Sequence, residues 1–138
     1  MSMDQVRMLS FEQHGDERGH LVVVEGQKDV PFDIRRVFYI YGSDETVVRG
    51  CHANRRSQFV LVNVAGQSKV RVRDGLGNEA VFAINRPHTG LYLPRMVWKE
   101  MYDFSPDAVL LVLSSEAYDP GEYIRDYAAF ESEVSGRA

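Results

Sequence analysis

Two segments of the chain carry residues whose types and spacing suit proton-transfer chemistry. Residues 49–58 include His52, Asn54 and Gln58, and residues 90–100 include Lys99. An imidazole has an unperturbed pKa of ~6.5, so His52 could accept and return a proton near neutral pH. A lysine ammonium can stabilise a developing oxyanion, or donate a proton if burial lowers its pKa. The two segments predict one polar site, provided that the fold brings them together.

The order of these residues resembles the layout of the cupin β-barrel. Metal-binding cupins place His-x-His-x-x-x-Glu on the first segment and a further histidine on the second, and the matching positions here are His52, Asn54, Gln58 and Lys99. Divalent transition metals prefer imidazole, carboxylate or thiolate ligands, and of these four residues His52 alone offers one. Cys51 is expected to point away from His52, because side chains alternate along a strand. We therefore expect no metal, and a site that works through side chains.

The elements that must position these residues read as short strands. Apolar residues recur at period two between turns rich in Gly, Asn, Asp and Pro, which indicates a sandwich or closed barrel. We predict an all-β cupin fold (a double-stranded β-helix, or jelly-roll barrel) in one domain spanning residues 1–138. The expected strands are 6–11, 21–25, 35–41, 47–51, 58–65, 68–73, 79–84, 90–93, 97–102 and 108–114.

A single α-helix is expected at the C-terminus. Asp119, Pro120 and Glu122 have the order of a capping box, with a cap residue, a proline at the first helical position and a glutamate at the third. Tyr123, Tyr127, Phe130 and Val134 then recur at spacings of four and three, as on a helix that packs against a sheet.

Composition excludes several classes of function. The 138 residues carry a formal charge of −4, which removes the basic face that nucleic-acid binding uses. The one cysteine cannot form an internal disulfide. The longest apolar run, 108–113, is far shorter than the ~20 residues of a membrane helix, and the N-terminus does not read as a secretory signal. We expect a cytoplasmic protein with no nucleic-acid or membrane partner.

Several segments, taken in order, resemble the nucleotide-linked sugar 3,4-ketoisomerases, the WxcM-like cupins of bacterial surface-polysaccharide pathways. The segments are residues 16–21 (DERGHL), 31–40 (PFDIRRVFYI), 49–53 (RGCHA), 90–92, 97–105 (VWKEMYDFS) and 118–127 (YDPGEYIRDY). The resemblance covers nearly the whole chain, and its specificity comes from the number of segments in sequence order.

The resemblance implies a reaction and an assembly. Family members isomerise dTDP-4-keto-6-deoxyglucose to the 3-keto sugar as homodimers, without metal or organic cofactor, and an aminotransferase uses the product. The chemistry is proton abstraction beside a carbonyl, an enediol intermediate and reprotonation at the neighbouring carbon. His52 matches the family's base. Asn54 and Lys99 replace two of its usual histidines, and we expect them to polarise the carbonyl.

The resemblance and the residue chemistry also nominate a substrate-binding set. Arginines suit a diphosphate because the guanidinium presents a fork of donors. Gln58 is expected to face inward, and Lys69 and Arg71 form either a solvated face or a basic pocket wall; His14, His20 and His88 are expected at the surface. The predicted substrate-binding residues are Arg18, Arg36, Tyr39, Arg49, Gln58, Arg71, Tyr92 and Glu100.

Two alternative functions remain open at this point. The replacement of both auxiliary histidines by Asn54 and Lys99 is also compatible with a sugar-nucleotide-binding cupin that has lost turnover. The third and weaker hypothesis is an isomerase or epimerase retuned to a related keto-sugar. A binding module would leave the protons of the sugar in place, whereas a retuned enzyme would exchange them at another carbon or on another sugar.

Overall fold

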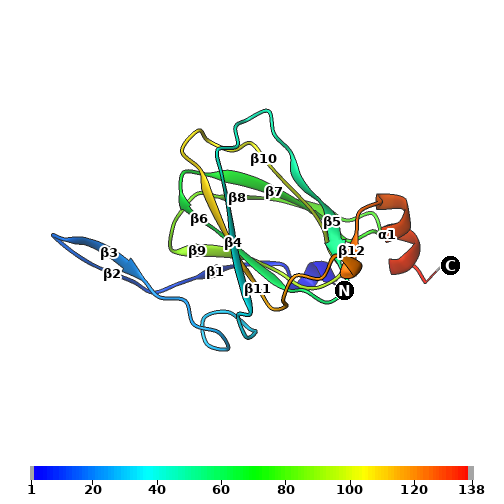
Figure 1. The fold of residues 1–138 in the computed structure, drawn as a ribbon, viewed down its shortest axis with the longest axis horizontal. Coiled ribbons are helices and arrows are strands. Elements are labelled where there is room, and N and C mark those ends of the chain that lie inside the picture. The colour runs from blue at the N-terminus through cyan, green and yellow to red at the C-terminus, as the bar shows by residue number, and fades with distance from the viewer. Residues whose placement is uncertain (1, 137–138) are drawn as a thin grey trace.

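The structure, a computed structural model, describes residues 2–136 and is dominated by short β-strands (Figure 1). In chain order the elements are η1 (Ser2–Gln5), β1 (Arg7–Ser10), β2 (Gln13–Asp16), β3 (Gly19–Val22), β4 (Arg36–Tyr41), β5 (Arg49–Asn54), β6 (Phe59–Ala65), β7 (Ser68–Arg73), β8 (Glu79–Ile84), β9 (Thr89–Leu93), β10 (Trp98–Tyr102), β11 (Val109–Ser114), η2 (Pro120–Glu122), β12 (Tyr123–Ile124) and α1 (Tyr127–Val134).

Two five-stranded antiparallel sheets face one another and form the barrel. The first has the strand order β1-β9-β6-β11-β4 and the second β12-β5-β10-β7-β8. Apolar side chains from both sheets meet between them, among them Leu61 of β6, Val72 of β7 and Leu91 of β9, each at most 1% exposed. This arrangement confirms the all-β cupin fold with one C-terminal α-helix that the sequence predicts.

A second apolar layer covers the outer face of the first sheet. Val60 and Val62 of β6 point away from the barrel interior and pack with Val30 and Phe32, which lie in the long segment before β4. Both faces of β6 are therefore covered, which explains why its sequence is an almost continuous apolar run instead of an alternating one.

A polar hairpin, β2–β3, projects from the barrel and is the element that the sequence did not predict (Figure 1). Its strands pair only with each other, through a two-residue turn at Glu17 and Arg18. The Asp16 carboxylate closes the turn by accepting bonds from the Arg18 backbone N–H (2.8 Å) and guanidinium (2.6 Å). The strand expected at 21–25 accordingly begins earlier and ends at Val22.

The helix start that the sequence predicts is wrong. Asp119 does cap a turn, accepting a bond from the Gly121 N–H, but that turn is the short 3-10 helix η2, and the chain then extends into β12. The α-helix begins at Tyr127 with Asp126 as its N-cap. Phe130 packs on Trp98 as part of the expected apolar stripe. Within residues 2–136, neither α1 nor any other helix is long and apolar enough to cross a bilayer.

The four histidines divide between the surface and the interior. His14 and His20 are exposed on the β2–β3 hairpin, as expected. His88 is half-buried, with its Nδ1 atom shielded from solvent, so the surface position predicted for it is wrong. His52 lies in β5 and is half-buried.

Candidate active site

A narrow cavity of about 40 Å³ lies inside the barrel, and His52 and Lys99 both line it. A water molecule needs roughly 10–15 Å³, so the space could hold a few of them. The lining is otherwise mostly apolar and aromatic. The lining residues are Phe38 of β4, His52 of β5, Phe59 and Leu61 of β6, Lys99 and Met101 of β10, Val112 of β11 and Tyr123 of β12.

The pairing of β5 with β10 brings the two candidate segments together. His52 is the Cα partner of Lys99, and directly opposed residues of an antiparallel pair share one face. A bulge follows, because Glu100 pairs with Gly50 and leaves Cys51 without a partner in this register. Gly50 (φ 84°) and Cys51 (φ 57°) have left-handed backbone conformations there. Such bulges re-aim side chains beside functional sites, and Cys51 is exposed while His52 faces the cavity, as expected.

His52 is neutral in this environment. Burial lowers its pKa to about 3, and the positive charges of Lys99 and Arg125 act in the same direction. Its ring packs edge-on against Tyr123 at 4.8 Å between centroids. The Nδ1 atom is buried and has no hydrogen-bond partner among the described residues. A neutral imidazole with a free ring nitrogen can accept a proton.

Lys99 is a buried cation with few partners. It is 3% exposed, and its Nζ donates a 3.1 Å hydrogen bond to Oδ1 of Asn54 and lies 4.9 Å from the centre of the Phe59 ring. Burial lowers the pKa of Lys99 from 10.5 to about 7, although the charge of Glu122 partly opposes this shift. Lys99 can therefore act near neutral pH as a cation or as a proton donor.

Asn54 fixes the lysine and leaves a polar group without a partner. Its amide is 1% exposed, and Nδ2 forms no hydrogen bond within the part of the chain that the structure describes. Nδ1 of His52 and Nε of Arg36 are in the same situation. Because buried polar atoms are nearly always paired, three such atoms from residues near one cavity indicate that a polar ligand binds there.

Arg36 is the predicted arginine that the structure places closest to this centre. It shares the inward face of β4 with Phe38, and its guanidinium donates to Oη of Tyr123 at 3.3 Å. The same guanidinium lies 5.4 Å from the ring centre of Tyr118, which is 60% exposed. Arg36 thus lies between Tyr123, which lines the cavity, and Tyr118, which is exposed to solvent. Arg49 lies at the exposed start of β5, paired with the cavity residue Met101.

Gln58 and Tyr92 lie outside the cavity, so the inward orientation predicted for Gln58 is wrong. Phe59 takes the inward position, and the neighbouring Gln58 falls on the outer side of the sheet by alternation. Its Oε1 accepts a 2.6 Å hydrogen bond from the Tyr92 hydroxyl. Tyr92 packs in the outer apolar layer, with the Arg7 guanidinium 4.8 Å from its ring centre.

Four further predicted binding residues lie outside the cavity: Arg71, Glu100 and Tyr39 on outer faces of the sheets, and Arg18 on the hairpin. Arg71 forms ion pairs with Glu79 (2.8 Å) and Glu100 (3.5 Å), on the face opposite to Val70 and Val72. The structure therefore favours the solvated face over the basic pocket wall. Tyr39 is 62% exposed on the outer face of β4, where it stacks on Tyr41. Arg18 is at the tip of the projecting hairpin.

The different placement of Arg36 and Arg71 leads to a direct prediction. Replacing Arg36 by alanine should raise the KM for a nucleotide sugar about tenfold or more, because a charge-assisted contact to an anion is typically worth ~1.5–3 kcal/mol. The matched change Arg71→Ala should leave KM within about twofold, because its ion pairs with Glu79 and Glu100 lie on the outer face of the sheet, away from the cavity. Steady-state kinetics of both variants measure the difference, and equal effects would contradict the assignment of Arg36.

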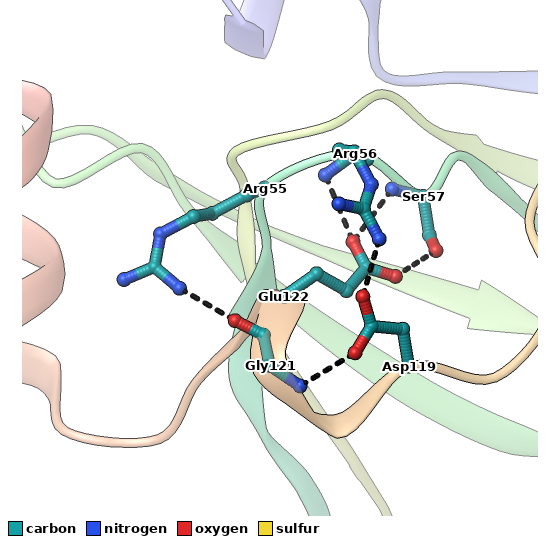
Figure 2. Close-up of polar contacts among 6 residues, drawn as sticks. All are labelled: Arg55, Arg56, Ser57, Asp119, Gly121 and Glu122. Carbon is teal, nitrogen blue, oxygen red and sulfur yellow. Dashed lines mark hydrogen bonds and ion pairs between the residues drawn. The ribbon is translucent and has the colours of Figure 1, made fainter.

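The sequence analysis did not single out two residues beside this centre. Tyr123 was assigned to the helical stripe but lies in β12, paired with Asn54, with its ring on His52. Glu122 was assigned to the capping box, but its carboxylate reaches across to the loop after β5 (Figure 2). An available signal was the glycine at 121, which weakens a continuous helix through this segment.

The residues described hold no cluster of three or more His, Cys, Asp or Glu side chains with the spacing of a metal site. The polar side chains that line the cavity are the His52 imidazole, the Lys99 amine and the Tyr123 phenol, with the Asn54 amide bonded to Lys99. This set offers a single good ligand for a divalent transition metal.

Comparison with known proteins gives one consistent picture. The family model for FdtA, described as WxcM-like, C-terminal, matches residues 4–135. A curated relative, the TDP-4-oxo-6-deoxy-alpha-D-glucose-3,4-oxoisomerase of Aneurinibacillus thermoaerophilus, is 38% identical over 129 residues, covering 94% of this chain and 92% of the relative.

Solved structures agree with this match. A His-to-Asn variant of the 3,4-ketoisomerase QdtA of Thermoanaerobacterium thermosaccharolyticum, in complex with TDP-4-keto-6-deoxyglucose, superposes with a TM-score of 0.92 at 39% identity, covering 96% of this chain and 95% of that one. WlaRA of Campylobacter jejuni, described as a TDP-fucose-3,4-ketoisomerase, has a TM-score of 0.89 at 35% identity, covering 94% and 96%.

Proposed function

The chain belongs to the WxcM-like FdtA family, and we propose that it is a sugar 3,4-ketoisomerase acting on a nucleotide-linked 4-keto-6-deoxyhexose of the TDP-4-keto-6-deoxyglucose type. The observation that carries this proposal is the register pairing of His52 with Lys99 at one mostly apolar cavity. A neutral imidazole beside a buried cation is the combination that enolisation of a ketone requires.

The reaction moves two protons without net oxidation. His52 removes the hydrogen on C3, and the electron pair forms a C3=C4 double bond while the C4 oxygen becomes an enediolate. His52 then returns its proton to C4, and the hydroxyl proton on O3 passes to O4, which leaves a carbonyl at C3. The pKa of about 3 keeps His52 neutral before each cycle, and the enediolate charge stabilises the imidazolium that forms.

Lys99 stabilises the negative charge on O4. Its Nζ is held by Asn54 and by the Phe59 ring, so it is oriented before the substrate arrives. Charges that are already oriented in a site with little water stabilise a transition state at little reorganisation cost. With a pKa near 7 Lys99 can also relay the proton from O3 to O4. Asn54 holds the lysine by accepting a hydrogen bond from its Nζ.

We place C3 and C4 of the sugar at the cavity, beside His52 and Lys99, and the diphosphate at its mouth. Arg36, and Arg49 at the rim, supply guanidinium donors there. No metal or organic cofactor enters this scheme.

We further propose that the enzyme is a homodimer whose β2–β3 hairpin completes the site of the partner. Among residues 2–136, the hairpin strands pair with each other and not with the barrel, and the Arg18 guanidinium at the tip bonds to Asp16. β4, an edge strand of the first sheet, presents an exposed apolar row at Val37, Tyr39 and Tyr41 that a second subunit would cover. In such a dimer Arg18 serves a diphosphate bound by the other subunit.

Mixing two inactive variants tests this assembly. Arg18→Ala and His52→Asn homodimers should each be strongly impaired. Co-refolding them in equal amounts should restore about a quarter of wild-type activity, since half of the dimers are mixed and each mixed dimer has one intact site. Absence of recovery, despite exchange of subunits verified by native mass spectrometry, would mean that Arg18 does not act across the interface.

The proposed activity is tested with the nucleotide sugar itself. With TDP-4-keto-6-deoxyglucose labelled with ¹³C in the sugar, the carbonyl signal should move from C4 to C3 on addition of enzyme. The replacement of the family's histidines by Asn54 and Lys99 favours one competing function, a binding cupin without turnover. Tight binding by calorimetry with no carbonyl migration would establish that alternative. Migration on a different keto-sugar alone would indicate a retuned isomerase.

We place this reaction in the synthesis of a sugar for a surface polysaccharide. The 3-keto product is the substrate that a sugar 3-aminotransferase requires, because transamination needs a carbonyl at the carbon that receives the amine. We therefore expect the 3-keto product to accumulate when the isomerase acts alone and to be consumed when a sugar 3-aminotransferase is added. A coupled assay with an aminotransferase would measure this.

A further inference from the structure

The buried carboxylate of Glu122 is not one of the groups that transfer protons in the proposed reaction. Glu122, in η2, is 2% exposed and accepts hydrogen bonds from the backbone N–H groups of Arg56 (2.8 Å) and Ser57 (2.9 Å) and from the Ser57 hydroxyl (Figure 2). Burying a carboxylate is costly unless it is fully hydrogen-bonded, and these three donors meet that need.

The nearby arginines form their direct ion pairs with other carboxylates. The Arg55 guanidinium pairs with Glu133 (2.9 Å) and that of Arg56 with Asp119 (2.6 Å), both at the surface. Glu122 itself forms no ion pair with any residue of the described chain, so it remains a buried negative charge held by neutral donors. Burial alone would raise its pKa, but the Ser57 and backbone donors hold the pKa below its ordinary value, so Glu122 is ionised at neutral pH. The Asn54 amide adds to this effect.

Glu122 also ties the C-terminal segment to the end of β5. The Arg55 backbone N–H donates to the Glu122 carbonyl at 2.9 Å. Both the main chain and the side chain of Glu122 therefore accept hydrogen bonds from the loop that follows Asn54. The next residue, Tyr123, pairs with Asn54 in β12 and packs on His52. If these contacts were weakened, the Tyr123 ring would no longer be held against His52.

We propose that Glu122 is a positioning residue for the isomerisation: its buried carboxylate anchors β12 against β5, which holds Tyr123 on His52, and it supplies the negative charge that balances Lys99. The role rests on the proposed function, because His52 and Lys99 are the groups through which Glu122 acts. Its charge raises the pKa of both, against the larger effect of burial. The other charged or titratable groups around the cavity are Arg36 on β4, Tyr123 on β12 and Arg125 just after it.

The three lysines of the chain, Lys28, Lys69 and Lys99, allow a test that does not depend on activity. With lysine labelled with ¹³C at Cε, the Lys99 signal is identified by its loss in Lys99→Met and should titrate near pH 7. In Glu122→Gln, a nearly isosteric neutral variant, its midpoint should fall by roughly one pH unit, because an opposing charge has been removed.

Two matched variants separate charge from anchoring. Asp74→Asn removes another buried carboxylate, in the turn after β7, and should leave the Lys99 midpoint unchanged. Glu122→Asp keeps the charge but shortens the reach, so the midpoint should stay close to wild type while the His52 ring-proton signals shift as Tyr123 loosens. This second variant remains informative if Glu122→Gln does not fold.

An unchanged Lys99 midpoint in folded Glu122→Gln, or an equal fall in Asp74→Asn, would overturn the electrostatic role. Unchanged His52 signals in Glu122→Asp would overturn the anchoring role. If the midpoint falls as expected but wild-type protein shows no carbonyl migration, then Glu122 acts on Lys99 as described and the proposed function alone is wrong. In active protein, the alkaline limb of kcat/KM should move with the Lys99 midpoint.

Discussion

Replacing His52 by asparagine is expected to lower kcat about a thousandfold, because loss of a positioned general base typically costs 10²–10⁴ in rate. Asparagine preserves a polar group of similar size at this half-buried position, so the barrel should still fold. Binding of TDP should remain within about twofold of wild type, because we assign the diphosphate contacts to Arg36 and Arg49 and not to the imidazole. Stopped assays and calorimetry measure the two quantities.

His88→Asn is the matched control for this variant. His88 is also largely shielded and also has an Nδ1 atom without a hydrogen-bond partner among the described residues, but it lies in the loop before β9, outside the cavity. It should keep kcat within about twofold of wild type. Retention of more than a tenth of the activity by His52→Asn would assign the proton transfer to another group, with Lys99 the first to examine.

The second large effect concerns Lys99, where activity and stability should change in opposite directions. Lys99→Met should lower kcat by about 10²–10³, the usual cost of losing one group that stabilises an oxyanion. The same change should raise or preserve Tm, because it replaces a buried charge by an apolar side chain of similar length. Calorimetric melting and kinetics on one sample provide the comparison.

The pH dependence of this stability difference follows from the lowered pKa of Lys99. Between about pH 7 and pH 10.5 the unfolded chain holds the Lys99 proton and the folded chain does not. The contribution of Lys99 to the free energy of unfolding of the wild type therefore rises with pH in that window. The advantage of Lys99→Met should therefore be largest below pH 7 and shrink toward pH 10. A lower Tm for Lys99→Met across this range would show that the ammonium stabilises the fold, contrary to our account.

The sequence predicts the barrel well because its strands alternate against one apolar interior. Val70 and Val72 alternate with Lys69 and Arg71, and the structure places the valines in the barrel core and the basic residues outside it. The β2–β3 hairpin was not predictable by the same signal, because neither face of it is buried and Gln13–Asp16 has no apolar alternation.

The candidate site was predicted in part, for reasons that lie in the strand register. His52, Asn54 and Lys99 meet because β5 pairs with β10, as the cupin layout implies. The face of Gln58 was assigned wrongly because a strand buried on both faces gives no alternation to fix its parity, and β6 is such a strand. Tyr123 and Glu122 were missed because Asp-Pro-Gly-Glu has the same local pattern in a 3-10 turn as in an α-helical start.

The central claim is that His52 carries hydrogen from C3 to C4 of a 4-keto sugar, and deuterium exchange tests it most directly. Wild-type protein is incubated with TDP-4-keto-6-deoxyglucose in deuterated water and the sugar protons are followed by ¹H NMR. We predict loss of the C3 proton signal at a rate that matches the appearance of the 3-keto sugar, retention of the C5 proton signal, and neither change with His52→Asn. Broadening of the ligand signals on binding without any loss of the C3 proton would contradict the account and leave a sugar-nucleotide-binding protein in its place.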